Sequence, residues 1–161
     1  MFRLVSARQV AVALAVVLAL AGSALAGEPV PFKGSLGGDV TVTPLTPPPL
    51  LRVDVEARGK ATHLGRFALD IPHKANPAFG TAAGCYEFTA ANGDKVYAKF
   101  TGVATRTAIP GVLYIEETAT ITGGTGRFAG ATGSFTSERL YDMVALTTVG
   151  SFEGTISAPG K

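Results

Sequence analysis

The sequence contains a single cysteine, Cys85, and this scarcity limits how the fold can be stabilised. One cysteine cannot form a disulfide within the chain, so side-chain packing and sheet hydrogen bonds must hold the domain together. We expect Cys85 to be a small buried side chain beside Tyr86 and Phe88. A reactive thiol or a bridge between two chains is the alternative.

Clusters of basic residues are also missing. Removing Arg3 and Arg8, which lie in an N-terminal leader, from the 14 basic residues leaves 12, equal to the 12 acidic ones. A near-neutral surface argues against binding to nucleic acid or to anionic lipid.

The only long apolar run, residues 10–21, is too short to span a bilayer. It follows a short basic segment, and Ala24 and Ala26 form the small-x-small pattern of a signal peptidase site. This predicts a cleaved signal peptide at 1–26, a single domain at 27–161, and export to the periplasm or the extracellular space. A retained membrane anchor is the alternative; after cleavage we expect no membrane association.

Helical periodicity is absent from the rest of the chain, whereas two-residue alternation recurs throughout. In residues 52–58 every odd position is apolar and every even position is charged, as in a strand with one buried face. The pattern predicts an all-β domain with strands at 32–36, 39–43, 52–58, 61–71, 86–90, 95–103, 113–122, 134–141 and 144–156.

Turn signals separate these strands. We expect tight turns at Gly37-Gly38, at Asn92-Gly93 and at Pro110-Gly111, an extended connection at 44–49, and a long irregular segment at 72–84. Because no strand carries the lysines or prolines that protect an open edge, a closed antiparallel barrel of about eight strands is favoured over a sandwich.

The glycine-rich stretch 120–135 contains a formal match to a dinucleotide-binding fingerprint at 124–129. That fingerprint must open a helix, and here an alternating strand follows, so we interpret the stretch as a turn with Phe128 closing one end of the core. No cofactor is expected.

Residues 121–133, Ile-Thr-Gly-Gly-Thr-Gly-Arg-Phe-Ala-Gly-Ala-Thr-Gly, resemble the strand-turn-strand signature of allene oxide cyclase-like and dirigent-like proteins. Residues 59–67, Gly-Lys-Ala-Thr-His-Leu-Gly-Arg-Phe, are similar to a segment of exported bacterial relatives of that group. The resemblance implies an eight-stranded barrel with a central cavity, trimeric in many plant members. Since the signature is a structural turn, it implies no catalytic residue.

Alternation places two titratable groups on apolar faces. His63 is in phase with Phe67, and Glu117 is in phase with Ile115 and Ile121, so both are expected to point inward and could form an acid/base pair. Alternatively, His63 lies near a barrel mouth and Glu117 makes a structural ion pair with one of three arginines: Arg66, Arg106 or Arg127.

Motifs for other chemistry are missing. His73 follows Pro72 in the segment expected to be irregular and should face solvent. No spacing typical of metal ligands is present, so no metal site is expected, and no Gly-x-Ser-x-Gly motif of a serine nucleophile occurs. We therefore expect a non-enzymatic exported barrel that binds a small apolar or amphipathic ligand, with Tyr86, Phe67 and Tyr114 as candidate contacts, or that serves as a stable extracytoplasmic module. The alternative is a cofactor-free isomerase or cyclase using Glu117 and His63. Self-association is left open.

Overall fold

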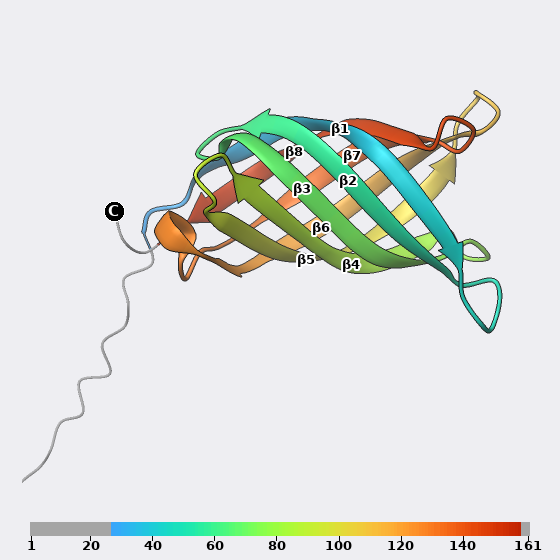
Figure 1. Cartoon of the computed structure of the whole chain (residues 1–161), viewed down its shortest axis with the longest axis horizontal. Coiled ribbons are helices and arrows are strands. Elements are labelled where there is room, and N and C mark those ends of the chain that lie inside the picture. Colours follow the sequence, from blue (N-terminus) through green and yellow to red (C-terminus); the bar gives the residue numbers. More distant parts are fainter. Residues whose placement is uncertain (1–26, 159–161) are drawn as a thin grey trace, which may run out of the picture.

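The computed structural model describes residues 27–158, which form a closed barrel of eight antiparallel strands (Figure 1). Consecutive strands pair with one another, and the first pairs with the last, which closes the sheet. The predicted all-β barrel is confirmed, while the predicted signal peptide lies outside the described residues. The strands are β1 (Val30–Pro44), β2 (Leu51–Ala61), β3 (Gly65–Asn76), β4 (Thr81–Ala90), β5 (Lys95–Arg106), β6 (Val112–Gly124), β7 (Thr132–Asp142) and β8 (Thr147–Ser157).

Alternation decides which side chains enter the barrel. On β2, Val53, Val55 and Ala57 are buried, while the charged side chains of Glu56 and Arg58 are exposed. The same period of two runs through all the strands, as expected when one sheet face forms the core and the other meets water. Among the described residues, no helix has the length and hydropathy needed to cross a membrane.

The turn expected at Gly37-Gly38 is wrong, because both glycines lie inside β1. A Cβ on Gly38 would lie 2.1 Å from the carbonyl oxygen of Glu56 and 2.5 Å from the Cα of Ala57. The glycine therefore permits close approach of β2, a role that glycine fills within strands as well as in turns.

The long irregular segment expected at 72–84 is also wrong. β3 continues to Asn76 and β4 begins at Thr81, leaving a short loop at 77–80. Pro72 is tolerated within the sheet because the pairing of β3 with β4 skips Ile71 and Pro72, where proline has no N–H to donate. The strand predicted at 61–71 begins only at Gly65, because Ala61 is the last residue of β2 and residues 62–64 form a turn.

The other expected turns are present. Asn92-Gly93 joins β4 to β5 with Gly93 at φ 87°, and Gly111 between β5 and β6 has φ 82°. In the glycine-rich stretch, β6 ends at Gly124 and a short 3-10 helix, η1 (Gly126–Phe128), leads to β7. Phe128 is only 4% exposed, so it closes this end of the core as expected.

The two ends of the barrel differ (Figure 1). The closed end carries η1 and the turns at 62–64 and 91–94, and the open end carries four loops, 45–50, 77–80, 107–111 and 143–146. Five phenylalanines from five strands fill the interior toward the closed end, with ring centroids 5.0 to 6.1 Å apart: Phe32, Phe67, Phe88, Phe135 and Phe152. Aromatic packing at these separations is favourable beyond the burial of area alone.

Candidate functional site

A cavity of about 430 Å³ occupies the interior at the open end of the barrel. Its walls are mainly aliphatic, with Val40, Val53 and Ile115 among the side chains that line it. Polar side chains also line it, among them His73, Glu117 and Arg139, and the glutamate and arginine are almost completely buried. The site is thus an apolar cavity with a small polar floor.

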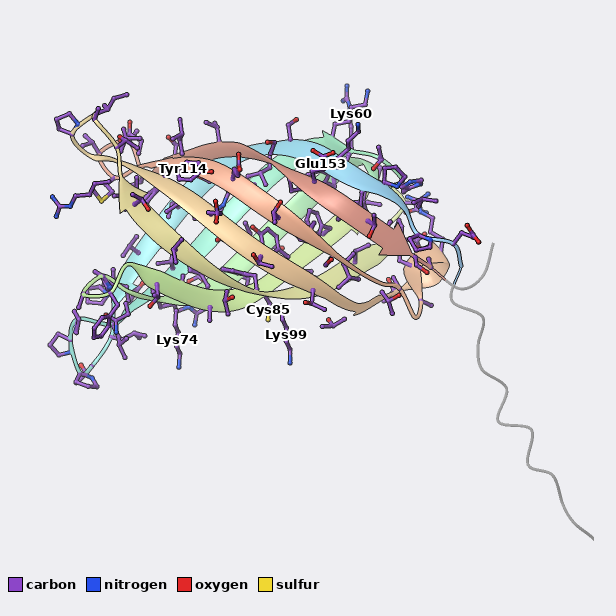
Figure 2. The ribbon with its side chains drawn as sticks, turned by 180° about the vertical axis from the view of Figure 1, so that it is seen from behind. Lys60, Lys74, Cys85, Lys99, Tyr114 and Glu153 are labelled. Atoms are coloured by element: carbon purple, nitrogen blue, oxygen red, sulfur yellow. The ribbon has the colours of Figure 1, made fainter. Side chains whose placement is uncertain are left out.

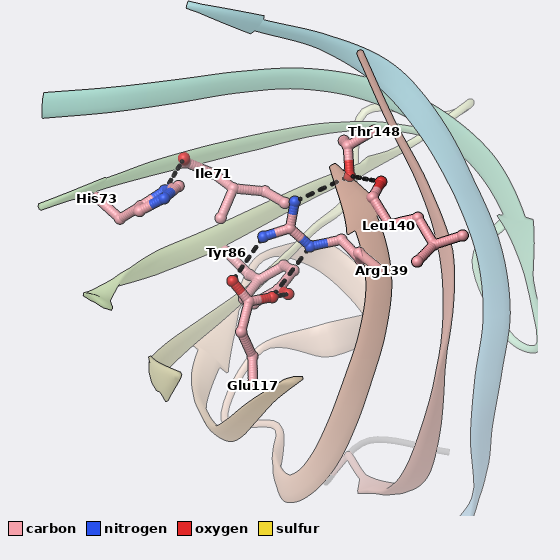
Figure 3. Close-up of polar contacts among 7 residues, drawn as sticks. All are labelled: Ile71, His73, Tyr86, Glu117, Arg139, Leu140 and Thr148. Atoms are coloured by element: carbon pink, nitrogen blue, oxygen red, sulfur yellow. Dashed lines mark hydrogen bonds and ion pairs between the residues drawn. The ribbon is translucent and has the colours of Figure 1, made fainter. Parts of the chain in front are cut away.

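Glu117 and Arg139 form a buried two-point ion pair on this floor (Figure 3). Arg139 Nη2 donates to Glu117 Oε1 at 2.6 Å, and Arg139 Nε donates to Glu117 Oε2 at 3.1 Å. Their strands are paired so that Glu117 lies opposite Ser137, which makes Arg139 its diagonal neighbour. The parallel bonds match the planar guanidinium to the carboxylate, the strongest geometry for such a pair.

Tyr86 supports the ion pair from β4. Its hydroxyl donates to Glu117 Oε2, and the residue is fully buried. Burial, reinforced by the Glu117 charge, raises the pKa of Tyr86, so the phenol remains protonated and acts as a donor. Burial also acts to lower the pKa of Arg139, but the charge and hydrogen bonds of Glu117 outweigh it and leave that pKa above its ordinary value.

Arg139 retains hydrogen-bonding capacity toward the cavity. A guanidinium has five N–H donors. Within the described part of the chain, two of them bond Glu117 and a third, on Nη1, bonds Thr148 Oγ1 at 3.3 Å. Thr148 in turn donates to the carbonyl of Leu140 at 3.0 Å, which fixes its hydroxyl. The remaining N–H groups can donate to an acceptor on a bound molecule.

His73 supplies an acceptor. Its Nδ1 lies 2.9 Å from the carbonyl oxygen of Ile71, and because a carbonyl only accepts, Nδ1 carries the proton and Nε2 has the free lone pair. Burial lowers the pKa of His73, opposed by the Ile71 hydrogen bond and the Glu117 charge. The ring is therefore neutral at neutral pH, and it also packs edge-to-face against Phe100 with centroids 5.6 Å apart.

Comparison with known proteins bears on the fold. No protein-family model and no curated protein sequence matches the chain. A solved structure, that of the pterocarpan synthase dirigent protein GePTS1, is similar with a TM-score of 0.58 over 83% of this chain and 92% of that chain, at 9% sequence identity. The fold is a dirigent-like barrel. At this identity the likeness shows the fold alone, which agrees with the barrel that the resemblance implied.

The dirigent-like barrel brings together only some of the residues singled out from the sequence. Glu117 points inward as expected and is 1% exposed. His63 does not: it lies in the turn at 62–64 with φ 63° and is exposed at the closed end, because β2 ends at Ala61. The inward histidine is His73, which was expected to face solvent; the extension of β3 to Asn76 puts it in phase with Ile71.

The candidate ligand contacts also fall in different places. Tyr86 is buried beneath the cavity and holds Glu117, and Phe67 belongs to the phenylalanine cluster, so neither lines the cavity. Tyr114 is on the outer face of the barrel, as Figure 2 shows. Cys85, expected to be buried, is an exposed free thiol on the same outer surface. It follows directly before Tyr86 on β4, so alternation points its side chain outward while that of Tyr86 points inward.

The partner of Glu117 was missed. Arg66, Arg106 and Arg127 were the expected candidates, and the structure gives Arg139 instead. The sequence carried a signal for it, because Arg139 is in phase with Phe135 on β7 and so lies on the inward face. Residues 27–158 contain no group of three or more His, Cys, Asp or Glu side chains arranged to hold a metal ion.

Proposed function

We propose that this barrel is an exported, non-catalytic binding protein for a small, largely apolar molecule that carries one hydrogen-bonding group. The observation that supports this most is the cavity of about 430 Å³, within the range of roughly 300–1,000 Å³ typical of small-molecule sites. Its aliphatic walls suit an apolar body. The free donors of Arg139 and the acceptor Nε2 of His73 suit a hydroxyl or carbonyl group at one end.

The polar floor favours binding over acid/base chemistry. Both oxygens of Glu117 already accept hydrogen bonds, two from Arg139 and one from Tyr86. Because the carboxylate is bonded at both oxygens and only 1% exposed, it is poorly placed to reach a bound molecule. Its role is to fix the guanidinium, which then presents its remaining donors in one orientation.

The binding proposal is tested by filling the cavity. Ala82 on β4 lines the cavity, and its neighbour Ala83 is exposed on the outer face. Ala82→Phe should abolish binding of naphthol, an apolar bicyclic probe with one hydroxyl, measured by calorimetry, whereas Ala83→Phe should bind as the parent does. Native mass spectrometry of the isolated protein should show a bound small molecule that Ala82→Phe loses. Equal binding by both variants would exclude the cavity as the site.

A second candidate function is a cofactor-free isomerase or cyclase. The pair first expected for it, Glu117 with His63, does not share a cavity, because His63 lies at the closed end. The observation that keeps this candidate is His73, whose neutral ring lines the cavity and could move a proton at Nε2. The enzyme candidate requires that His73→Gln still bind a substrate but no longer turn it over. If His73→Gln loses only affinity, the binding role is supported instead.

A further inference from the structure

The four loops at the open end form an uncharged surface with exposed apolar side chains. None of the residues in 45–50, 77–80, 107–111 and 143–146 is charged. Three loops expose a large apolar side chain at the tip: Phe79 is 78% exposed, Ile109 63% and Val144 85%. We call these three side chains the apolar rim. Exposed apolar groups gathered around an opening are typical of surfaces that meet a partner or a membrane.

The apolar rim is held in place by hydrogen bonds between its loops and the barrel. The N–H of Met143 donates to the carbonyl of Gly111 at 2.8 Å, which joins the β7–β8 loop to the β5–β6 loop. The N–H of Ala104 on β5 donates to Gly80 at 2.7 Å and fixes the β3–β4 loop. The three tip residues therefore project from loops that are fixed by backbone hydrogen bonds.

The backbone N–H groups of the three tip residues already donate hydrogen bonds. Phe79 donates its N–H to the carbonyl of Asn76 at 3.2 Å, and Ile109 donates to Thr107 Oγ1 at 3.1 Å. Val144 donates to Asp142 Oδ1 at 2.8 Å. An apolar medium penalises every unpaired donor, so these tips can leave water without exposing an unmet N–H group.

The opposite end has a different character. Around the closed end lie charged and titratable side chains from several segments, among them Glu28, His63, Asp94 and Arg127. The apolar rim thus lies at the end that contains the cavity mouth, and the two ends of the barrel differ in their exposed side chains.

We infer that the apolar rim docks onto the interfacial region of a lipid bilayer and inserts Phe79, Ile109 and Val144. The four loops carry no charge and so match an apolar phase, and the N–H groups of the three tip residues are already hydrogen-bonded, so insertion leaves none of them unpaired. Because basic and acidic residues balance in 27–161, the attachment depends on apolar insertion and is insensitive to salt. This inferred membrane docking takes the place of the expectation of no membrane association. The docking does not depend on what the cavity binds.

Insertion can be observed directly because the chain has no tryptophan. Phe79→Trp places a single reporter on the apolar rim, and Ala91→Trp places a matched one in the exposed turn at the closed end. With phosphatidylcholine vesicles, the tryptophan emission of the Phe79→Trp variant should shift to the blue and be quenched by brominated acyl chains. The emission of the Ala91→Trp variant should not change. All variants carry the same N-terminal segment, so any binding by residues 1–26 is common to them.

A loss variant tests the energetic role of the apolar rim. Phe79→Ser, Ile109→Ser and Val144→Ser combined should lower partitioning onto phosphatidylcholine vesicles about tenfold or more. Val149→Ser is the control, since Val149 is 58% exposed on β8 and lies outside the four loops. The three rim residues do not line the cavity, so naphthol binding and the melting temperature should stay unchanged in the triple variant. Failure here is therefore distinct from failure of the binding proposal.

Three results would overturn the inference. In the first, Phe79→Trp shows neither a shift nor quenching with vesicles. In the second, binding appears only when phosphatidylglycerol is added and disappears in high salt, which would assign it to surface charge. In the third, light scattering shows an oligomer of the parent that the triple variant loses, which would make the apolar rim an interface between copies of this chain.

Discussion

Arg139 on β7 and Glu117 on β6 face each other diagonally across the strand pair and form a two-point ion pair, with 2.6 Å between Nη2 and Oε1. Both side chains are nearly inaccessible to water, with exposed fractions of 3% and 1%. Desolvation opposes such a pair, and its parallel hydrogen bonds, with the donor from Tyr86, offset that cost. The pair forms the floor of the cavity and separates it from the phenylalanine cluster.

Removing one partner of this pair should be strongly destabilising. Glu117→Ala leaves the Arg139 guanidinium buried without a counter-ion and should lower the free energy of unfolding by about 3–5 kcal/mol, measured by urea denaturation. Combining it with Arg139→Met removes both charges and should recover much of the loss. Glu56→Ala, at an exposed position on β2, is the control and should change little. A loss in Glu117→Ala no larger than in this control would contradict a structural role for the pair.

Stability should depend on pH through His73. Burial lowers its folded pKa below the ordinary 6.5, so the unfolded chain binds more protons in the window between the two values. The contribution of His73 is therefore fully present above about pH 6.5 and is lost as pH falls through the folded pKa. We expect His73→Gln to flatten the fall in melting temperature as the pH is lowered from neutral past 6.5. His63→Asn, in the exposed turn, is the matched control, and a flattening in His73→Gln no larger than in this control would contradict the prediction.

Two turns at the closed end, the β4–β5 turn and the glycine-rich turn between β6 and β7, should be sensitive to added side chains for separable reasons. Gly93→Ala tests backbone conformation alone, since φ is 87° and no atom lies within 4 Å of the added Cβ; it should cost about 1 kcal/mol. Gly126→Ala should cost more, because φ is 57° and its Cβ would lie 1.9 Å from Asp94 Oδ1. The Asp94 carboxylate faces this turn, pairing with Arg127 at 3.6 Å, so added phosphate should not raise the melting temperature of the parent. Phosphate stabilisation that Gly126→Ala abolishes would indicate an anion site instead.

Export should remove residues 1–26. N-terminal sequencing of the protein recovered outside the cytoplasm should begin at Gly27, because Ala24 and Ala26 fit the specificity of signal peptidase. Ala24→Lys should block cleavage and leave a longer, cell-associated product, whereas Ser23→Ala, beside it, should be processed normally. Recovery of the intact N-terminus in the parent would favour the retained anchor.

Part of the candidate site could be predicted from the sequence. Glu117 was placed inward by simple alternation, and the same rule applied to β7 and β4 would have placed Arg139 inward and Cys85 outward. The assignment of the histidines failed for another reason. Which histidine faces inward depends on where β2 ends and how far β3 extends, and Thr62 to Leu64 carry no glycine or proline to mark the turn.

By itself, the sequence determined an all-β domain and its Asn92-Gly93 hairpin, because alternation and turn chemistry act between neighbours along the chain, and it favoured a closed barrel through the absence of edge protection. Only the tertiary structure decided what the barrel contains. The register of the strands brings Phe32, Phe67, Phe88, Phe135 and Phe152 into one cluster toward the closed end and leaves aliphatic side chains around a cavity at the other. Contacts across a barrel depend on strand tilt and stagger, which join residues far apart in sequence, and no local pattern records them.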